Sequence, residues 1–390
     1  MNKYVKKLAL TIPYVKGYYE EIERYRSEIE RLRSEIERLR SKGIKYYSCL
    51  ELERCDLIFL GRIDTGEKCM GFCCRAYIDY PRVALCETPE ESIKNIVKLR
   101  AEIITESIKF SLLGKNAKDE DRKFTSECVK CSSYSLNAWE GGWDGLIHSI
   151  SMAMYPSPCQ CKCIYCNVPK DLSMRQINAE SVKSYEKVFA IIDWVQKNDM
   201  TAGDLYWDVL CGETIIHPFR DRIFSLVKDH VAHFFTNCFI FDEMISANLS
   251  VNVQSLIDSS IDSGTPETWH KVKGVDNFNT VIENFEKYLA NGVRPEQIHL
   301  KYVILPGIND NLEDYRSMIN IVKERFKIQS MVISVDTNIK QRVSFIKPAG
   351  YLLAMLRKNN ITSSFYLNIF QDEVERITAF SDELLRSGEV

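Results

Sequence analysis

The sequence lacks the features that mark membrane-embedded, secreted and nucleic-acid-binding proteins. No stretch approaches the roughly 20 consecutive apolar residues of a membrane span. The short apolar run near the N-terminus is interrupted by Pro13 and Lys16 and is followed by no small-residue cleavage site, so a signal peptide is not expected. Glycine and proline are few, at 17 and 11 residues, and the net charge is only -3. No excess of basic charge favours nucleic acid or an anionic membrane. Because neither a membrane span nor a signal peptide is expected, the sequence predicts a cytoplasmic protein.

Cysteine is absent from the C-terminal part of the chain and concentrated before it. All 14 cysteines lie between Cys49 and Cys238. A reducing compartment disfavours structural disulfides, and clustered cysteines in such a compartment more often bind metal. The uneven distribution therefore predicts a local, functional use of cysteine.

An N-terminal helix is predicted over residues 1–43. Within it, the segment 22–42, IERYRSEIERLRSEIERLRSK, repeats with a period of seven residues. Isoleucine at position a, mostly leucine at d, and opposite charges at g and e are typical of a parallel two-stranded coiled coil, through which the chain would form a homodimer. Fewer than three heptads give only a marginal dimer. A single amphipathic helix that packs on its own protein fits the pattern equally well.

A cysteine-rich accessory module is predicted over residues 44–139. One helix is expected within it, over residues 89–113, because Thr88 can serve as the N-cap, Pro89 occupies the first helical position and Glu91 completes a capping box. Cysteines lie on both sides of this helix. The pattern suggests a small module held together by metal.

From residue 140 to residue 390, apolar strand-like runs alternate with amphipathic helices. The predicted strands cover residues 146–154, 204–210, 231–237, 251–262, 298–305 and 330–336. Six strand–helix units in succession predict an α/β fold with a parallel sheet or a partial (β/α)6 TIM-type barrel. In such folds the functional site lies at the carboxyl ends of the strands.

The segment SPCQCKCIYC, residues 157–166, follows the first of these strands. Cys159, Cys163 and Cys166 have the spacing C-x3-C-x2-C, and three thiolates on one loop can bind three corners of an iron–sulfur cubane. A structural zinc site would need four ligands, and the pairs Cys128/Cys131 and Cys163/Cys166 could provide them. From spacing alone both interpretations stay open. Cys161 has no ligand role in the iron–sulfur interpretation.

This cysteine pattern, with the aromatic Tyr165 directly before the last cysteine, resembles the signature of the radical SAM enzymes. Further segments are similar to motifs of that family in the same order, although Cys211 and Cys238 stand where the family has glycine. These segments are CGET (211–214), FTNC (235–238), SSIDSGTPETWHKVKG (259–274) and VILPGINDN (303–311). The resemblance covers roughly residues 140–345.

The resemblance implies a 4Fe-4S cluster bound by Cys159, Cys163 and Cys166, with one iron open to S-adenosylmethionine (SAM). It implies that reductive cleavage of SAM yields a 5′-deoxyadenosyl radical, which abstracts a hydrogen atom from the substrate. The cofactor carries this chemistry and the protein positions it. An electron donor such as flavodoxin or ferredoxin is implied as a partner.

The same resemblance implies that Gly212, Glu213, Ser260, Asp262 and Tyr165 belong to the SAM-binding site. Glu213, which follows Gly212, would accept a charge-assisted hydrogen bond from the methionine ammonium of SAM. Ser260 would contact the ribose hydroxyls, with Asp262 nearby, and Tyr165 would flank the adenine.

A second metal site is a further expectation. Cys69, Cys73 or Cys74, Cys128 and Cys131 could bind an auxiliary iron–sulfur cluster before the barrel. Zinc in the same ligands, or buried cysteine without metal, are the alternatives.

The substrate is less constrained by the sequence than the cofactor. The heptad helix followed by a cysteine-rich module resembles proteins of surface-polysaccharide pathways, which would imply a sugar or nucleotide-sugar substrate. The segment 259–274 and the accessory cysteines resemble those of peptide-modifying maturases. A metal-bearing scaffold or electron carrier is the alternative of another class. His217, Asn309 and Asp336, at or just past predicted strand ends, are candidate substrate-facing groups.

Overall fold

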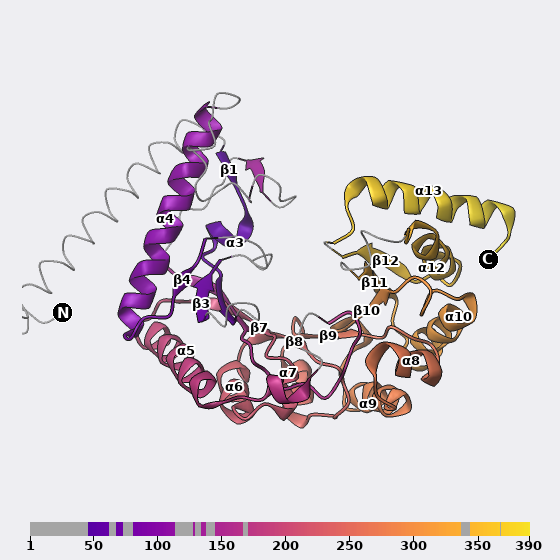
Figure 1. Cartoon of the computed structure of the whole chain (residues 1–390), viewed down its shortest axis with the longest axis horizontal. Coiled ribbons are helices and arrows are strands. Elements are labelled where there is room, and N and C mark those ends of the chain that lie inside the picture. The colour runs from indigo at the N-terminus through magenta and orange to yellow at the C-terminus, as the bar shows by residue number, and fades with distance from the viewer. Residues whose placement is uncertain are drawn as a thin grey trace, which may run out of the picture. The chain divides into compact units, whose positions relative to one another are not determined.

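The computed structural model describes residues 46–61, 68–72, 81–113, 128, 134–137, 145–166, 171–336, 344–366 and 368–390. The predicted heptad helix over 22–42 lies outside these residues. The chain divides into two compact units. One comprises Met1–Cys55, Phe72–Pro81 and Asn95–Leu146, and the other comprises Asp56–Gly71, Arg82–Lys94 and Ile147–Val390. Figure 1 labels the elements of both.

The second unit is built on a ten-stranded sheet with the order β12-β11-β10-β9-β8-β7-β6-β2-β3-β4. Its strands are β2 (Leu57–Gly61), β3 (Lys68–Gly71), β4 (Val83–Ala84), β6 (Ile147–Ala153), β7 (Thr201–Val209), β8 (Val231–Phe235), β9 (Leu256–Ser260), β10 (Ile298–Ile304), β11 (Ser330–Val335) and β12 (Thr362–Phe365). All pairings from β12 to β2 are parallel, and only β3 and β4 run antiparallel to their neighbours.

The fold is therefore a mixed α/β fold with a large parallel sheet, as the sequence predicts. Each of the six predicted strands forms, from β6 to β11. Among the described strands the two end strands, β12 and β4, are not paired with each other, so the sheet does not close into a barrel. The structure also adds β12 at one end and β2, β3 and β4 at the other, which the sequence pattern did not predict.

Helices follow the parallel strands along the chain. They are α5 (Ala179–Lys197), α6 (Arg220–Val227), α7 (Glu243–Val251), α8 (Pro266–Lys273), α9 (Phe278–Ala290), α10 (Leu312–Asn320), α12 (Ile346–Lys358) and α13 (Gln371–Ser387). Side-chain caps fix several of their starts: Asn178 accepts from Ser181 N, and Thr265 accepts from Thr268 N. These caps satisfy backbone N–H groups that lack a partner within the helix. Figure 1 shows α5, α6, α7 and α9 on one side of the sheet.

Alternation along the strands gives the sheet two different faces. On β8, Ala232 and Phe234 are fully buried, and the Phe234 ring lies 6.0 Å from that of Phe224 on α6. Neighbouring side chains of a strand point to opposite faces. His233 and Phe235 therefore project from the face away from α6, which is called the inner face below.

The first unit contains the antiparallel pair β1 (Tyr46–Ser48) and β5 (Ser135–Asn137), the short helix α3 (Leu50–Glu53) and most of α4 (Pro89–Leu113). The helix predicted over 89–113 is confirmed, and Glu91 N donates to Thr88 Oγ1 at 3.3 Å. Arg100 is buried and donates to the carbonyl oxygens of Leu52 and Glu53 at 2.7 and 2.8 Å. This side chain thereby satisfies the C-terminal carbonyls of α3. No helix among the described residues is long and apolar enough to cross a bilayer.

Gly264, just after β9, tests how tightly the loops at the strand ends are packed. A Cβ at this residue would lie 2.1 Å from Asp314 O and 2.5 Å from Met318 N, both backbone atoms of α10. We expect Gly264→Ala to lower the free energy of unfolding by at least about 2 kcal/mol, because the backbone of α10 has to move. The control is Gly203→Ala on β7, where a Cβ would meet nothing within 4 Å. Equal melting temperatures for the two variants would contradict the close approach.

Candidate functional site

The cysteine loop follows β6 and is anchored to the end of α8. Lys162 N donates to Lys273 O at 2.8 Å, and Ile164 N donates to Val272 O at 3.0 Å. Gly274, which ends α8 with φ of 68°, leaves room for this approach, since a Cβ there would lie 2.9 Å from Lys162 Cβ. The loop is therefore held by backbone contacts that do not depend on its thiols.

Two further contacts hold the start of the loop. The buried Arg175 donates from Nη1 to the carbonyl oxygens of Cys159, at 3.3 Å, and Cys161. Glu213 N donates to Pro158 O at 2.7 Å. Gly212 has φ of 62°, and a Cβ there would lie 2.5 Å from Pro158 O, so this position requires glycine.

Three thiols of the loop, those of Cys159, Cys161 and Cys163, lie together. Hydrogen bonding with the Cys161 thiol lowers the pKa of Cys159 to about 6 and that of Cys163 to about 7. The same hydrogen bonds, with burial, raise the pKa of Cys161. Asn237 Nδ2 donates to the sulfurs of Cys161 and Cys159 at 3.4 and 3.8 Å. Cys166 lies one turn further, where its N–H donates to Cys163 O at 3.2 Å.

This donor set fits an iron–sulfur cluster. Thiolates are the ligands of such clusters, and two of the predicted ligands, Cys159 and Cys163, favour the thiolate form. The structure also places Cys161, for which the sequence predicts no ligand role, between them, and its pKa is raised by the hydrogen bonds with both.

Glu213 lies beyond the end of β7 and is 1% exposed. Thr236 Oγ1 donates to Oε1 at 2.9 Å, and Asn237 N donates to Oε2 at 2.7 Å. Burial raises the pKa of Glu213 to about 7. The carboxyl group is thus fixed beside Asn237, whose amide reaches the cysteine sulfurs.

Asp262 is the centre of a buried hydrogen-bond network. Its Oδ2 accepts from Tyr165 OH at 2.6 Å and from Lys273 Nζ at 2.5 Å, and its Oδ1 accepts from Val303 N at 2.7 Å. Lys273 Nζ also donates to Tyr165 OH at 2.7 Å. Burial acts to lower the pKa of Lys273, but the charge of Asp262 outweighs it and the pKa is raised.

Sequence reasoning named Tyr165 and Asp262 but missed Lys273. The available signal was the KVKG end of the segment 259–274, in which Lys273 precedes the glycine that ends α8. Thr236 and Asn237 were within the FTNC segment but had no predicted role. Arg175 had no motif to indicate it.

The other sequence-predicted residues take different positions. Ser260 is the last residue of β9 and is half-buried. Asn309 is buried, donates to Asp262 O and Val303 O, and accepts from Leu305 N, so it holds the loop after β10 together. His217 packs against the rings of Tyr185 and Phe219, and burial lowers its pKa to about 4. Asp336 is buried directly after β11.

The cysteines of the predicted auxiliary site divide between the two units. Cys69 is fully buried on β3 of the large sheet, and Cys128 is buried in the first unit. Cys73, Cys74 and Cys131 lie outside the described residues. Burial, with smaller effects of its neighbours, raises the pKa of Cys49, which lies near Cys128.

Comparison with known proteins gives partial matches. No family model matches the chain. A curated relative, the GTP 3′,8-cyclase of Desulforamulus reducens, is 25% identical over 171 residues, which are 43% of this chain and 49% of that protein. The chain therefore spans about half the length of this relative.

Two solved structures also show similarity. SuiB of Streptococcus suis, bound to the precursor peptide SuiA, has a TM-score of 0.42 and 13% identity, covering 82% of this chain and 72% of that chain. A radical SAM methyltransferase from Sphaerobacter thermophilus has a TM-score of 0.36 and 12% identity, covering 54% of this chain and 63% of that chain. Because both TM-scores lie below 0.5, the function of this chain has to be inferred from its own residues.

The Asp262–Lys273 pair can be tested by removing one charge. Lys273→Met leaves the Asp262 carboxylate buried without its counter-ion, so we expect the free energy of unfolding to fall by about 3–5 kcal/mol. Lys271→Met, on the exposed side of the same helix, is the matched control and should change it by less than about 0.5 kcal/mol. Denaturant unfolding of both variants measures the difference. A Lys273→Met protein as stable as the control would show that the pair is not needed to hold the loop.

Proposed function

We propose that this chain is a radical SAM enzyme. The observation that supports this most is the cysteine loop at the carboxyl end of a parallel sheet, where Cys159 and Cys163 favour the thiolate form beside the fixed carboxyl group of Glu213. In parallel α/β folds this edge of the sheet is where ligands bind. A scaffold or electron carrier would have no need of the Glu213, Thr236 and Asn237 arrangement.

Cys159, Cys163 and Cys166 are proposed to bind a 4Fe-4S cluster, and Glu213 to accept from the ammonium of SAM. When bound, cluster and SAM supply the 5′-deoxyadenosyl radical that abstracts a substrate hydrogen. Cys161 is hydrogen-bonded with Cys159 and Cys163, so we propose it as a hydrogen-bond donor to ligand sulfurs and not as an iron ligand. Hydrogen bonds to sulfur are one means by which a protein tunes the potential of such a cluster.

Around the proposed SAM site, Gly212 allows the close approach of the loop and Ser260 is proposed to contact the ribose. Tyr165 is proposed to flank the adenine. Both Asp262 oxygens are engaged within the protein. Asp262 therefore contributes to the SAM site by orienting Tyr165 and the backbone at Val303.

The proposed substrate is a small polar molecule, and a sugar or nucleotide-sugar is the first candidate. Charged side chains on the inner face, such as Asp208, Asp258 and Lys301, suit a polar ligand. The relative named GTP 3′,8-cyclase acts, by its name, on a nucleotide. A peptide substrate is the second candidate, and flavodoxin or ferredoxin is the proposed electron donor. The auxiliary cluster or zinc site and the dimer through residues 22–42 remain predictions.

The cluster assignment predicts the metal content of cysteine variants. Cys159→Ala, Cys163→Ala and Cys166→Ala should each remove one cluster's worth of iron and sulfide from the anaerobically purified protein, because each removes one ligand. Cys161→Ala is the matched control within the same loop and should retain the iron. Iron and sulfide analysis with absorption spectra measures the outcome. Full iron and SAM cleavage in Cys163→Ala would disprove the ligand set.

The SAM assignment predicts a separate effect for Glu213→Gln. The amide oxygen can still accept from Asn237 N and the amide NH2 can donate to Thr236 Oγ1, but the charge that attracts an ammonium is lost, a contribution of roughly 1.5–3 kcal/mol. We therefore expect SAM affinity to fall about 10- to 100-fold with unchanged iron content. Equilibrium binding to the iron-loaded protein measures it, with the exposed Glu267→Gln on α8 as control. Parent-like affinity and 5′-deoxyadenosine formation in Glu213→Gln would show a purely structural glutamate.

A further inference from the structure

A row of polar side chains crosses the inner face of the large sheet. Ser151 on β6, Asp208 on β7 and His233 on β8 are direct neighbours in the strand register. Ser151 Oγ donates to Asp208 Oδ2 at 2.7 Å, and Asp208 Oδ1 lies 3.4 Å from His233 Nδ1. Side chains opposite each other on adjacent strands interact directly. The row therefore orients the imidazole of His233.

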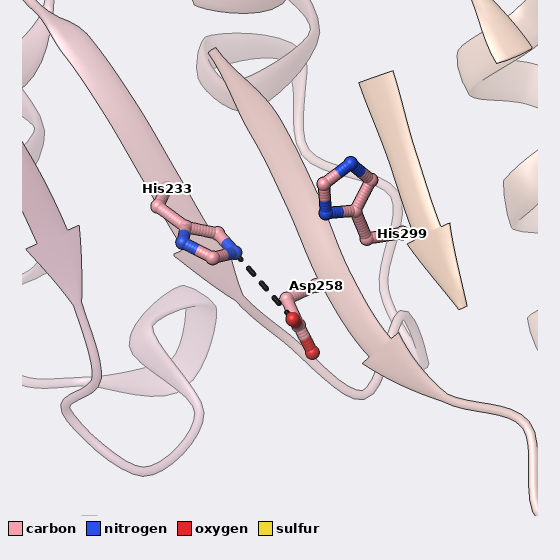
Figure 2. Close-up of side chains that lie close together, drawn as sticks. All are labelled: His233, Asp258 and His299. Atoms are coloured by element: carbon pink, nitrogen blue, oxygen red, sulfur yellow. Dashed lines mark ion pairs between the residues drawn. The ribbon is translucent and has the colours of Figure 1, made fainter. Parts of the chain in front are cut away.

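The row ends in three side chains with metal-ligating atoms. Asp258 on β9 is the register partner of His299 on β10, and it lies two residues beyond the level of His233. Figure 2 shows the side chains of His233, Asp258 and His299 projecting from three neighbouring strands toward one another. One ligand atom from each lies within 4.8 Å of the other two. The arrangement uses nitrogen and oxygen donors and involves none of the cysteines.

The Nε2 atom of His233 is buried, and its partner is the carboxylate of Asp258. Asp258 Oδ2 lies 3.5 Å from it, on the side of the converging ligand atoms. On the other side of the ring, Nδ1 faces Asp208. A carboxylate at the second nitrogen is the usual support of a metal-binding histidine, because it fixes the tautomer and the ring orientation.

We propose that His233, Asp258 and His299 bind one divalent transition-metal ion on the inner face, and Zn²⁺ is the probe that suits this donor set. Two histidines and one carboxylate are a known ligand set for zinc and for non-haem iron. Ligand atoms of one tetrahedral zinc ion lie roughly 3.3 Å apart, given bonds of about 2.0–2.2 Å. The three atoms therefore need only small side-chain rotations to close around an ion. Three protein ligands leave a coordination position for an oxygen atom of a substrate.

The charges around the three residues also favour a cation. Asp208 and Asp258 face His233 from both sides, whereas Lys301 Nζ is 3.9 Å from Asp258 Oδ1 and lies over the ring of Tyr366. One lysine balances only one of the two carboxylates. Lys301 engages Oδ1, so Oδ2 of Asp258 remains turned toward the histidines and can serve as the metal ligand.

The test is zinc binding to the full-length, anaerobically purified protein with its iron retained. Equilibrium dialysis gives the zinc stoichiometry and affinity, and zinc K-edge X-ray absorption gives the ligands. Nitrogen and oxygen ligands lie at about 2.0–2.2 Å and cysteine sulfur at about 2.3 Å. This difference separates zinc on the inner face from zinc bound by cysteines. We expect one zinc ion per chain with nitrogen and oxygen ligands.

Variants assign that ion to its residues. His299→Ala should lower the affinity of this zinc more than about 100-fold. Asp208→Asn removes the carboxylate that supports His233 but no proposed ligand, and it should lower the affinity about 10- to 100-fold. His270→Ala is the matched control, since His270 is exposed on α8 and pairs with Asp276 at 2.6 Å. Iron content should be the same in all three variants.

Two results would overturn the proposal. One is a parent protein whose zinc is bound by sulfur alone. The other is a His299→Ala protein that binds zinc with the parent affinity and the same nitrogen and oxygen ligands. In either case the three inner-face residues are part of a charge network in which His233 bridges Asp208 and Asp258. Neither result affects the proposed iron–sulfur site, because Cys163→Ala tests that site through iron and leaves the three inner-face residues intact.

Discussion

The buried carboxylate of Asp262 is the contact on which the candidate cofactor site depends. Its two oxygens join the cysteine loop through Tyr165, the end of α8 through Lys273 and strand β10 through Val303 N. A buried charge is tolerated only where a counter-ion and hydrogen bonds satisfy it completely. The three elements are therefore confined to one arrangement. The loop that carries Cys159 to Cys166 takes its position from this arrangement and from the backbone contacts with Val272 and Lys273.

The parts of the fold that the sequence predicts are those with a strong local pattern. The strands β6 to β11 and the helix over 89–113 have apolar periodicity or a clear cap, which are visible in a short window of sequence. The strand β12, with the sequence TSSF, and the two-residue strand β4 have no such pattern. They exist because a neighbouring strand offers unpaired backbone groups. Pairing of that kind is determined by tertiary structure, and no local signal precedes it.

The residues of the candidate sites also fall into two groups, those with a local sequence signal and those brought together only by the tertiary structure. Cysteines spaced within one loop can be recognised from the sequence, and so can Glu213 within its short motif. The partner of Asp262 is eleven residues away on a helix, and only the turn between β9 and α8 brings Lys273 back to it. Asp208, His233, Asp258 and His299 come from four separate strands, and the strand register alone makes them neighbours. A composition of six histidines gives no indication of which two will meet.

The two proposed metal sites differ in donor chemistry and in their position along the strands of the sheet. Thiolates, which are soft ligands, lie at the strand ends and suit an iron–sulfur cluster, whereas imidazole and carboxylate lie on the inner face and suit a single zinc or iron ion. Ser260 ends β9 at the level of the candidate SAM site, and Asp258 lies two residues before it on the same face. Two residues of a strand span roughly 7 Å. Under the proposed function, a small polar substrate of about that length would contact the inner-face residues with one end and the candidate SAM site with the other.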